Sequence, residues 1–183
     1  MKARDGLQAA LDSSAVETCI NLLSEEGGED TQREAAITLG LACYDDTAKI
    51  IAIQAMGSGT KGNTIQFNDG VAHLAALLES STCRVKSAAL GALMTITTVD
   101  AGKRAVLSTK VAEGAIKALG EKDHVVVLNA LKLIASIAAH PDTRAEFRDD
   151  DSCLGAIQML EASSDSMIAK HASIAREAVL WVP

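Results

Sequence analysis

The sequence has 183 residues, of which 48% are hydrophobic and only 2% are aromatic, so it can bury the core of one domain with small aliphatic side chains. Acidic residues outnumber basic ones by 24 to 17, and the formal net charge of −7 disfavours broad binding to nucleic acid or to an anionic membrane surface. No run of 18 apolar residues, no signal-peptide core and no C-x-x-C cysteine pair occurs. We therefore expect a cytoplasmic protein without a membrane span, a zinc site or a disulfide framework.

The first predicted unit is a partial one, over residues 14–44. It opens with VETCINLL at 16–23, which predicts a short helix. A longer helix follows after an acidic turn, and its apolar residues recur at a spacing that places them on one helical face. They are Ala35, Ala36, Leu39 and Ala42.

The second predicted unit, over residues 45–98, contains the same kind of motifs but is longer. It begins with the short helix DTAKIIAIQAM and ends with the long helix TCRVKSAALGALMTITT. Leu23 and Leu78, which end corresponding motifs, are 55 residues apart, or 14 more than the interval of 41 found later in the chain. We predict the extra residues as an inserted loop at 57–68, because this segment is rich in Gly, Ser, Thr and Asn.

Two further units are predicted at 99–139 and 140–183. The segments GAIKAL and GAIQML repeat the middle helix, and their final leucines, Leu119 and Leu160, follow Leu78 at intervals of 41 residues. The long-helix motif repeats at the same interval, so that Ala89, Leu90, Leu93 and Ile96 correspond to Ala130, Leu131, Ile134 and Ile137. A fixed period near 40 is typical of a stacked helical repeat.

With these motifs the chain resembles the armadillo repeat family, whose unit has a short helix, a middle helix G-a-[IV]-x-x-L-v-x-L-L and a long helix A-x-x-x-L-x-N-L-a. DGVAHLAALL and EGAIKAL match the middle helix, and ALGALMTIT and ALKLIASIA match the long one. The resemblance covers residues 14–183, and the period of 41 with three helices favours armadillo over the related HEAT repeat. It implies one domain over residues 1–183 with an all-α fold, a right-handed superhelix of about four three-helix repeats. It also implies a non-catalytic scaffold for protein–protein interaction, with no cofactor and no small-molecule substrate.

In armadillo proteins that bind extended peptides, the long helices line a concave groove. The resemblance implies that the groove here is lined by Arg33, Ile37, Leu41, Ser87, Gly91, Thr95, Leu128, Lys132, Ser136, Ser173 and Glu177. The smallest of these, expected to let a partner approach closely, are Ser87, Gly91, Thr95 and Ser136. Nuclear-import receptors of the family carry a ladder of Asn at the places held here by Leu41, Thr95, Ser136 and Glu177. Because Asn both donates and accepts hydrogen bonds, its absence argues against recognition of nuclear localisation signals.

The chain ends in an apolar segment, Leu180, Trp181 and Val182, although the terminal units of a solenoid need polar outer faces. Two interpretations are open. In one, Trp181 folds back over the last core, as an aromatic side chain with a polar edge can do. In the other, this end docks onto a larger assembly.

We expect the partners to be other proteins within a multi-subunit complex. The main hypothesis is a structural subunit of a larger assembly, by analogy with short armadillo proteins of the ciliary axoneme and its radial spokes. That analogy places the chain in the cytoplasm or on the axonemal cytoskeleton. The alternative is a transient adaptor that binds linear peptides in the concave groove.

The alternative from another class is a nucleotide-binding enzyme that uses GSGTKGNT at 57–64. This loop has the spacing G-x-x-x-x-G, but Asn63 and Thr64 stand where a phosphate-binding loop has Lys and then Ser or Thr, and a helix rather than a strand precedes it. The four histidines include no i, i+4 pair, so no metal site or catalytic site is predicted.

Overall fold

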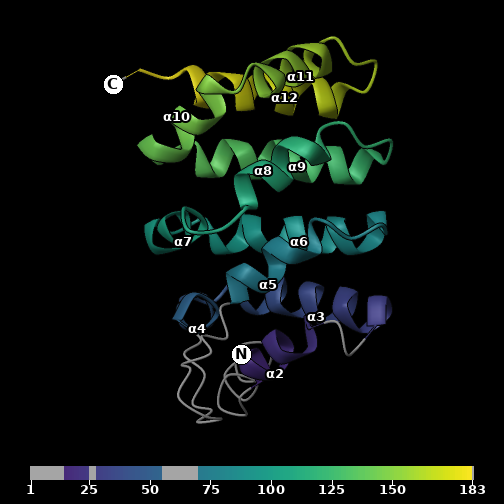
Figure 1. The fold of residues 1–183 in the computed structure, drawn as a ribbon, viewed down its shortest axis with the longest axis vertical. Helices are drawn as coiled ribbons and strands as arrows, with labels where there is room; N and C mark the ends of the chain where they lie inside the picture. Colours follow the sequence, from purple (N-terminus) through teal and green to yellow (C-terminus); the bar gives the residue numbers. More distant parts are fainter. Residues whose placement is uncertain (1–14, 25–27, 55–69, 183) are drawn as a thin grey trace, which may run out of the picture.

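The computed structural model describes residues 15–24, 28–54 and 70–182. Within these ranges the chain has eleven helices and no strand, stacked from α2 at one end to α12 at the other (Figure 1). The predicted all-α solenoid is therefore confirmed. The predicted inserted loop at 57–68 lies outside the described residues.

A pair of helices is followed by three groups of three. The helices are α2 (Ala15–Leu22), α3 (Gly28–Ala42), α4 (Asp46–Gln54), α5 (Gly70–Leu77), α6 (Cys83–Ile96), α7 (Asp100–Val106), α8 (Val111–Ala118), α9 (His124–Ile137), α10 (Pro141–Asp149), α11 (Asp151–Glu161) and α12 (Ser166–Leu180). The long helices α3, α6, α9 and α12 pack on one another in that order and lie roughly parallel as one layer, with the short helices α4, α7 and α10 on one side of it (Figure 1).

Several helices begin at a residue whose side chain satisfies the free backbone N–H groups of the first turn. Asp123 Oδ1 accepts hydrogen bonds from the backbone N–H groups of Val125 and Val126, which starts α9. Asp165 caps α12 in the same way. Hydrogen bonds from the backbone N–H groups in the first turn of α12 hold the pKa of the Asp165 carboxyl below its usual value. Asp150 starts α11, so one member of the acidic run at 149–151 is a helix cap.

The core consists of the apolar faces that the 41-residue period predicts. Leu93 and Ile134, which correspond in α6 and α9, are fully buried. Their counterpart in α12 is Ala175, also fully buried, so the last unit fills the same position with a much smaller side chain. The last unit also contains the large side chain of Phe147 in α10, which is fully buried.

A cation recurs at the equivalent place of each short helix, in Lys49, Lys103 and Arg144. Arg144 is buried, and its Nη1 donates a hydrogen bond of 3.3 Å to the carbonyl oxygen of Ala138, the residue that ends α9. A positive charge at the carboxyl end of a helix is favourable because the helix dipole and the free carbonyl groups point there. Arg144 thus joins α10 to the end of the preceding long helix.

The turn between a long helix and the next short helix is so tight that it requires glycine in one unit. A Cβ atom added at Gly102 in α7 would lie 2.1 Å from the carbonyl oxygen of Ile96 in α6. In the next unit Thr143 occupies the equivalent position, and its hydroxyl donates a hydrogen bond to the carbonyl oxygen of Ile137. The carbonyl group at the end of the long helix is therefore closely approached in both units. In one unit the Cα atom of Gly102 approaches it, and in the next the hydroxyl group of Thr143 donates a hydrogen bond to it.

Candidate functional site

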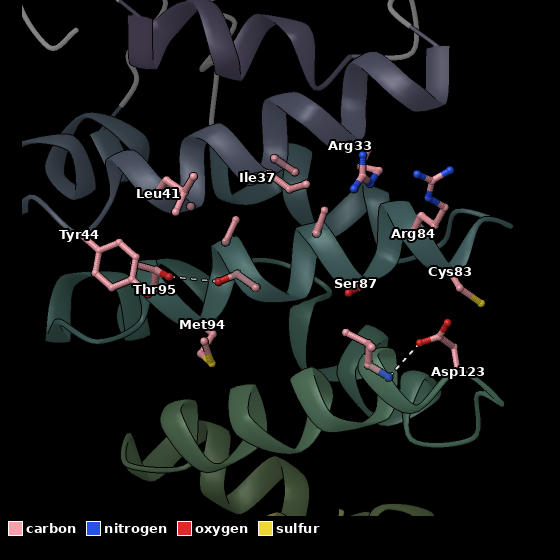
Figure 2. A pocket seen from close by; sticks show the side chains of 16 residues that line it. Arg33, Ile37, Leu41, Tyr44, Cys83, Arg84, Ser87, Met94, Thr95 and Asp123 are labelled. Atoms are coloured by element: carbon pink, nitrogen blue, oxygen red, sulfur yellow. Dashed lines mark hydrogen bonds between the residues drawn. The ribbon is translucent and has the colours of Figure 1, made fainter. Parts of the chain in front are cut away.

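A groove of about 430 Å³ lies between α3 and α6 and reaches the start of α9 (Figure 2). We call it the α3–α6 groove. It is lined by Arg33, Ala36, Ile37, Gly40, Leu41, Tyr44, Cys83, Arg84, Ser87, Ala88, Gly91, Ala92, Met94, Thr95, Asp123 and Val125.

Small residues hold α3 and α6 close together beneath this groove. Gly40 packs directly on α6, since a Cβ atom added there would lie 3.1 Å from the Cα atom of Ala92. Ala36 and Ala88 also line the groove at this contact. Because none of these residues has a long side chain, the space above the helix contact is left open.

One end of the groove is apolar. Leu41 and Tyr44 are 61% and 74% exposed, and Met94 of α6 lies at the same end (Figure 2). Exposure of this extent is unusual for large apolar side chains that lie next to one another, because each leaves apolar surface in contact with water.

The other end of the groove is basic. Arg33 of α3 and Arg84 of α6 lie there beside Cys83 (Figure 2). Among the described residues that line the groove, Asp123 supplies the only carboxylate. Its Oδ1 accepts hydrogen bonds of 2.9 and 3.2 Å from backbone N–H groups of α9. This carboxylate is therefore engaged as a helix cap, and neither arginine forms an ion pair with it among the described residues.

The structure brings six of the eleven predicted groove residues together in this groove, and five lie elsewhere. The six are Arg33, Ile37, Leu41, Ser87, Gly91 and Thr95. The five are Leu128, Lys132 and Ser136 on α9 and Ser173 and Glu177 on α12. Ser173 and Glu177 are exposed, whereas the three residues of α9 are half-buried.

Two of the small polar residues that were expected to leave room for a partner instead join neighbouring units. Ser136 donates a hydrogen bond of 3.2 Å to the carbonyl oxygen of Thr97 in the preceding unit, and its Oγ lies 3.1 Å from the hydroxyl oxygen of the same threonine. Ser87 accepts hydrogen bonds at its carbonyl oxygen and its hydroxyl from the side-chain amide of Asn129, at 3.1 and 3.3 Å. Their hydroxyl groups thus serve packing between units.

Sequence reasoning missed several groove residues because it followed only the i, i+4 row of each long helix. Arg84 lies three residues before Ser87, and Tyr44 lies three residues after Leu41. Residues three and four apart share a helical face, so the i, i+3 row of α6 would have found Arg84. Tyr44 follows the end of α3 at Ala42, and helical periodicity does not extend to it. Val125 comes from the next unit, and no periodicity within one helix could have found it.

At the carboxyl end of the chain, Trp181 lies against the buried Arg144. The guanidinium carbon of Arg144 is 4.7 Å from the centroid of the Trp181 ring, a distance suited to a cation–π contact. Trp181 nonetheless remains 54% exposed, and Val182 is 73% exposed. Trp181 therefore contacts Arg144 of its own domain, while this end of the described chain keeps exposed apolar surface.

Replacing Trp181 with alanine is expected to destabilise the chain by about 0.5–1 kcal/mol, the usual contribution of an exposed cation–π contact. Thermal unfolding followed by circular dichroism would measure this. Val182→Ala serves as the control, because Val182 is 73% exposed and its loss is expected to change stability by less than about 0.5 kcal/mol. Equal melting temperatures for the two variants would contradict a capping role for the tryptophan.

The described residues contain no group of three or more His, Cys, Asp or Glu side chains that could hold a metal ion. Burial raises the pKa of the Cys43 and Cys153 thiols to about 12, which makes them inert as nucleophiles. The GSGTKGNT segment at 57–64 lies outside the described residues. In the part of the chain that the structure describes, no helix has both the length and the apolar character that crossing a membrane requires.

No protein-family model matches the sequence, and no curated protein sequence matches it. Two engineered proteins of the Northeast Structural Genomics Consortium resemble the structure with a TM-score of 0.81 each, at 22% and 26% sequence identity. The matches cover 96% and 98% of this chain and 68% and 41% of those proteins. A designed armadillo repeat protein in complex with the peptide (KR)4 is similar with a TM-score of 0.78 at 17% identity, over 96% of this chain and 68% of that one. The chain therefore has an armadillo-like helical repeat fold.

Proposed function

We propose that this chain is a non-catalytic scaffold that holds a segment of a partner protein in the α3–α6 groove. A protein-binding scaffold is the role that an armadillo-like repeat fold suggests in general. The observation that carries the specific proposal is the pair of exposed side chains Leu41 and Tyr44 at one end of the groove. Adjacent exposed apolar side chains in a concave surface mark a site where another molecule binds.

The composition of the groove supports a protein partner over a small molecule. Tyr, Met and Arg are enriched at the centres of protein interfaces, and Tyr and Arg carry a large share of binding energy there. The groove presents Tyr44, Met94, Arg33 and Arg84 together.

We further propose that the partner and this chain form a lasting multi-subunit complex. A second exposed apolar surface, at Leu180, Trp181 and Val182, supports this proposal, because a subunit within an assembly contacts neighbours on more than one side. The ciliary or axonemal form of the proposal rests on family analogy. Immunofluorescence against an axonemal marker in ciliated cells tests it, and a diffuse cytoplasmic signal would contradict it.

A transient adaptor that binds linear peptides is the second candidate. It is favoured by the similarity to a designed armadillo repeat protein that was solved with a bound peptide. The two candidates differ in the lifetime of the complex. A partner that co-elutes with the chain through size-exclusion chromatography supports a stable subunit, and a partner that dissociates within seconds in surface plasmon resonance supports an adaptor.

Replacing Gly91 with phenylalanine tests the groove. A Cβ atom added at Gly91 would have Asn129 Nδ2 at 3.9 Å as its nearest neighbour, an ordinary van der Waals contact. Because Gly91 lines the groove, we expect the new ring to occupy groove space. In affinity capture from native extract with quantitative mass spectrometry, the variant is expected to lose its co-purifying proteins at least about tenfold, because a steric block in a central pocket costs roughly 2 kcal/mol or more.

The matched control is Gly155→Phe. Gly155 lies on α11 outside the groove, and a Cβ atom added there would meet nothing within 4 Å. This variant is expected to retain its partners, and both variants are expected to unfold cooperatively near the wild-type melting temperature. If Gly91→Phe keeps the same partners in the same amounts, the groove is not the docking surface.

A further inference from the structure

We infer that the segment bound in the α3–α6 groove is acidic at one end and apolar at the other, with a carboxylate between Arg33 and Arg84 and a large apolar side chain on Leu41 and Tyr44. This inference rests on the proposed function, since it assigns a chemistry to the partner of that groove. It follows from three features of the groove: its two arginines, its net charge and the distance between its ends.

The first feature is the availability of the two guanidinium groups. Among the described residues, Arg84 has no ion-pair partner, and its side chain is exposed. Arg33 pairs with the neighbouring Glu34, whose side chain is 63% exposed, and such surface pairs contribute little because water screens both charges. Two planar guanidinium groups at one end of a groove suit a carboxylate ligand. Each guanidinium group can bind a carboxylate through two parallel hydrogen bonds.

The second feature is that the groove is basic on an acidic protein. Its charged lining residues are Arg33, Arg84 and Asp123, a net charge of +1, whereas the whole chain carries −7. Charge complementarity of this kind orients a partner and sets its register more than it sets affinity. A basic segment such as the (KR)4 peptide of the designed armadillo protein would place like charge against the two arginines here.

The third feature is the separation between the basic and apolar ends. Arg33 and Leu41 are eight residues apart on α3, which corresponds to about 12 Å at roughly 1.5 Å per residue. An extended peptide covers about 12 Å in roughly four residues. The groove therefore fits an extended segment in which Asp or Glu and a large apolar residue such as Leu or Phe are about four positions apart.

Selection from a phage-displayed library of random linear peptides tests this on the intact chain. Peptides that bind the wild-type chain and are lost on Gly91→Phe are the groove-dependent set. We expect this set to be enriched in Asp or Glu about four positions from Leu or Phe. A groove-dependent set that is basic or uncharged would overturn the inference and leave the proposed function standing. If no peptide depends on the groove, the proposed function fails, and the inference fails with it.

Charge reversal of Arg84 then tests the carboxylate contact directly. For one selected acidic peptide, followed by fluorescence anisotropy, Arg84→Glu is expected to weaken binding at least about tenfold, as the loss of an interfacial charge pair does. Arg104→Glu is the matched control, because Arg104 is an exposed arginine of α7 outside the groove and its reversal changes the net charge equally. Equal losses in the two variants, with both chains folded, would overturn the contact.

Discussion

Gly102→Ala is expected to destabilise the fold by about 3 kcal/mol or more, at the upper end of what overpacking costs. The added Cβ atom would lie 2.1 Å from the carbonyl oxygen and 2.7 Å from the carbonyl carbon of Ile96, and 3.1 Å from the Cα atom of Thr97. All three are backbone atoms at the end of α6, so no side-chain rotation can relieve the clash. Either α7 moves away from α6 or the last turn of α6 unwinds, and both changes expose core.

Equilibrium urea unfolding followed by circular dichroism measures this difference. Gly155→Ala is the matched control, since it makes the same chemical change in α11, where the added Cβ atom meets nothing within 4 Å. There the substitution is expected to stabilise the chain by about 0.5–1 kcal/mol, because alanine favours the helix over glycine. The close approach of α7 to α6 would be contradicted if the two variants had the same unfolding midpoint.

Much of the fold could be predicted from the sequence because every unit buries the same positions. Leu90 and Leu131 are 41 residues apart, both are fully buried, and they occupy equivalent places in α6 and α9. A side chain that packs against the next unit must be apolar and buried in each unit. The 41-residue period of buried positions is therefore kept even where the residue type changes. Ala172 of α12, which is equivalent to Leu131, is also fully buried. The interval of 41 therefore predicted both the helices and their order.

The groove could be predicted only in part, because its shape depends on the offset between neighbouring helices. The i, i+4 row of α3 contains Arg33, Ile37 and Leu41, and all three line the α3–α6 groove. The same rule applied to α9 chose Ser136, whose hydroxyl is bound to Thr97 in the preceding unit. Helix packing decides whether a small polar residue faces solvent or a neighbouring unit. Helical periodicity within one helix does not predict this.

The same limit applies to Asn129. The predicted ladder positions hold no Asn. Yet Asn129 uses its amide to donate to the carbonyl oxygen of Ser87, 42 residues earlier. Its partner is a backbone atom, so nothing in the identity of the partner residue could have revealed the contact from the sequence. The side-chain amide here serves packing between units.

Phe147→Ala is expected to destabilise the chain by about 3–5 kcal/mol, the usual range for removing a buried phenylalanine. Phe147 is fully buried, and it occupies the place that Ala52 and Val106 hold in the preceding short helices. Helix α10 packs against α12, whose buried residues include the small Ala172 and Ala175, so we expect the last unit to depend strongly on Phe147 for its core volume.

The effect is expected to be local, since each unit of a solenoid contacts only its neighbours and its stability is a sum of unit and interface contributions. In native-state hydrogen exchange, the amides of α10, α11 and α12 should exchange faster in the variant, and those of α3 and α6 should keep their wild-type protection. Val106→Ala is the matched control, because it removes a smaller side chain from the equivalent place between two complete units. Uniform acceleration from α3 to α12 in the Phe147 variant would instead show that the whole chain unfolds as one cooperative body. In that case the stability of the α3–α6 groove would depend on the packing of the last unit. A partner bound at one end of the solenoid would then change the stability of the other end.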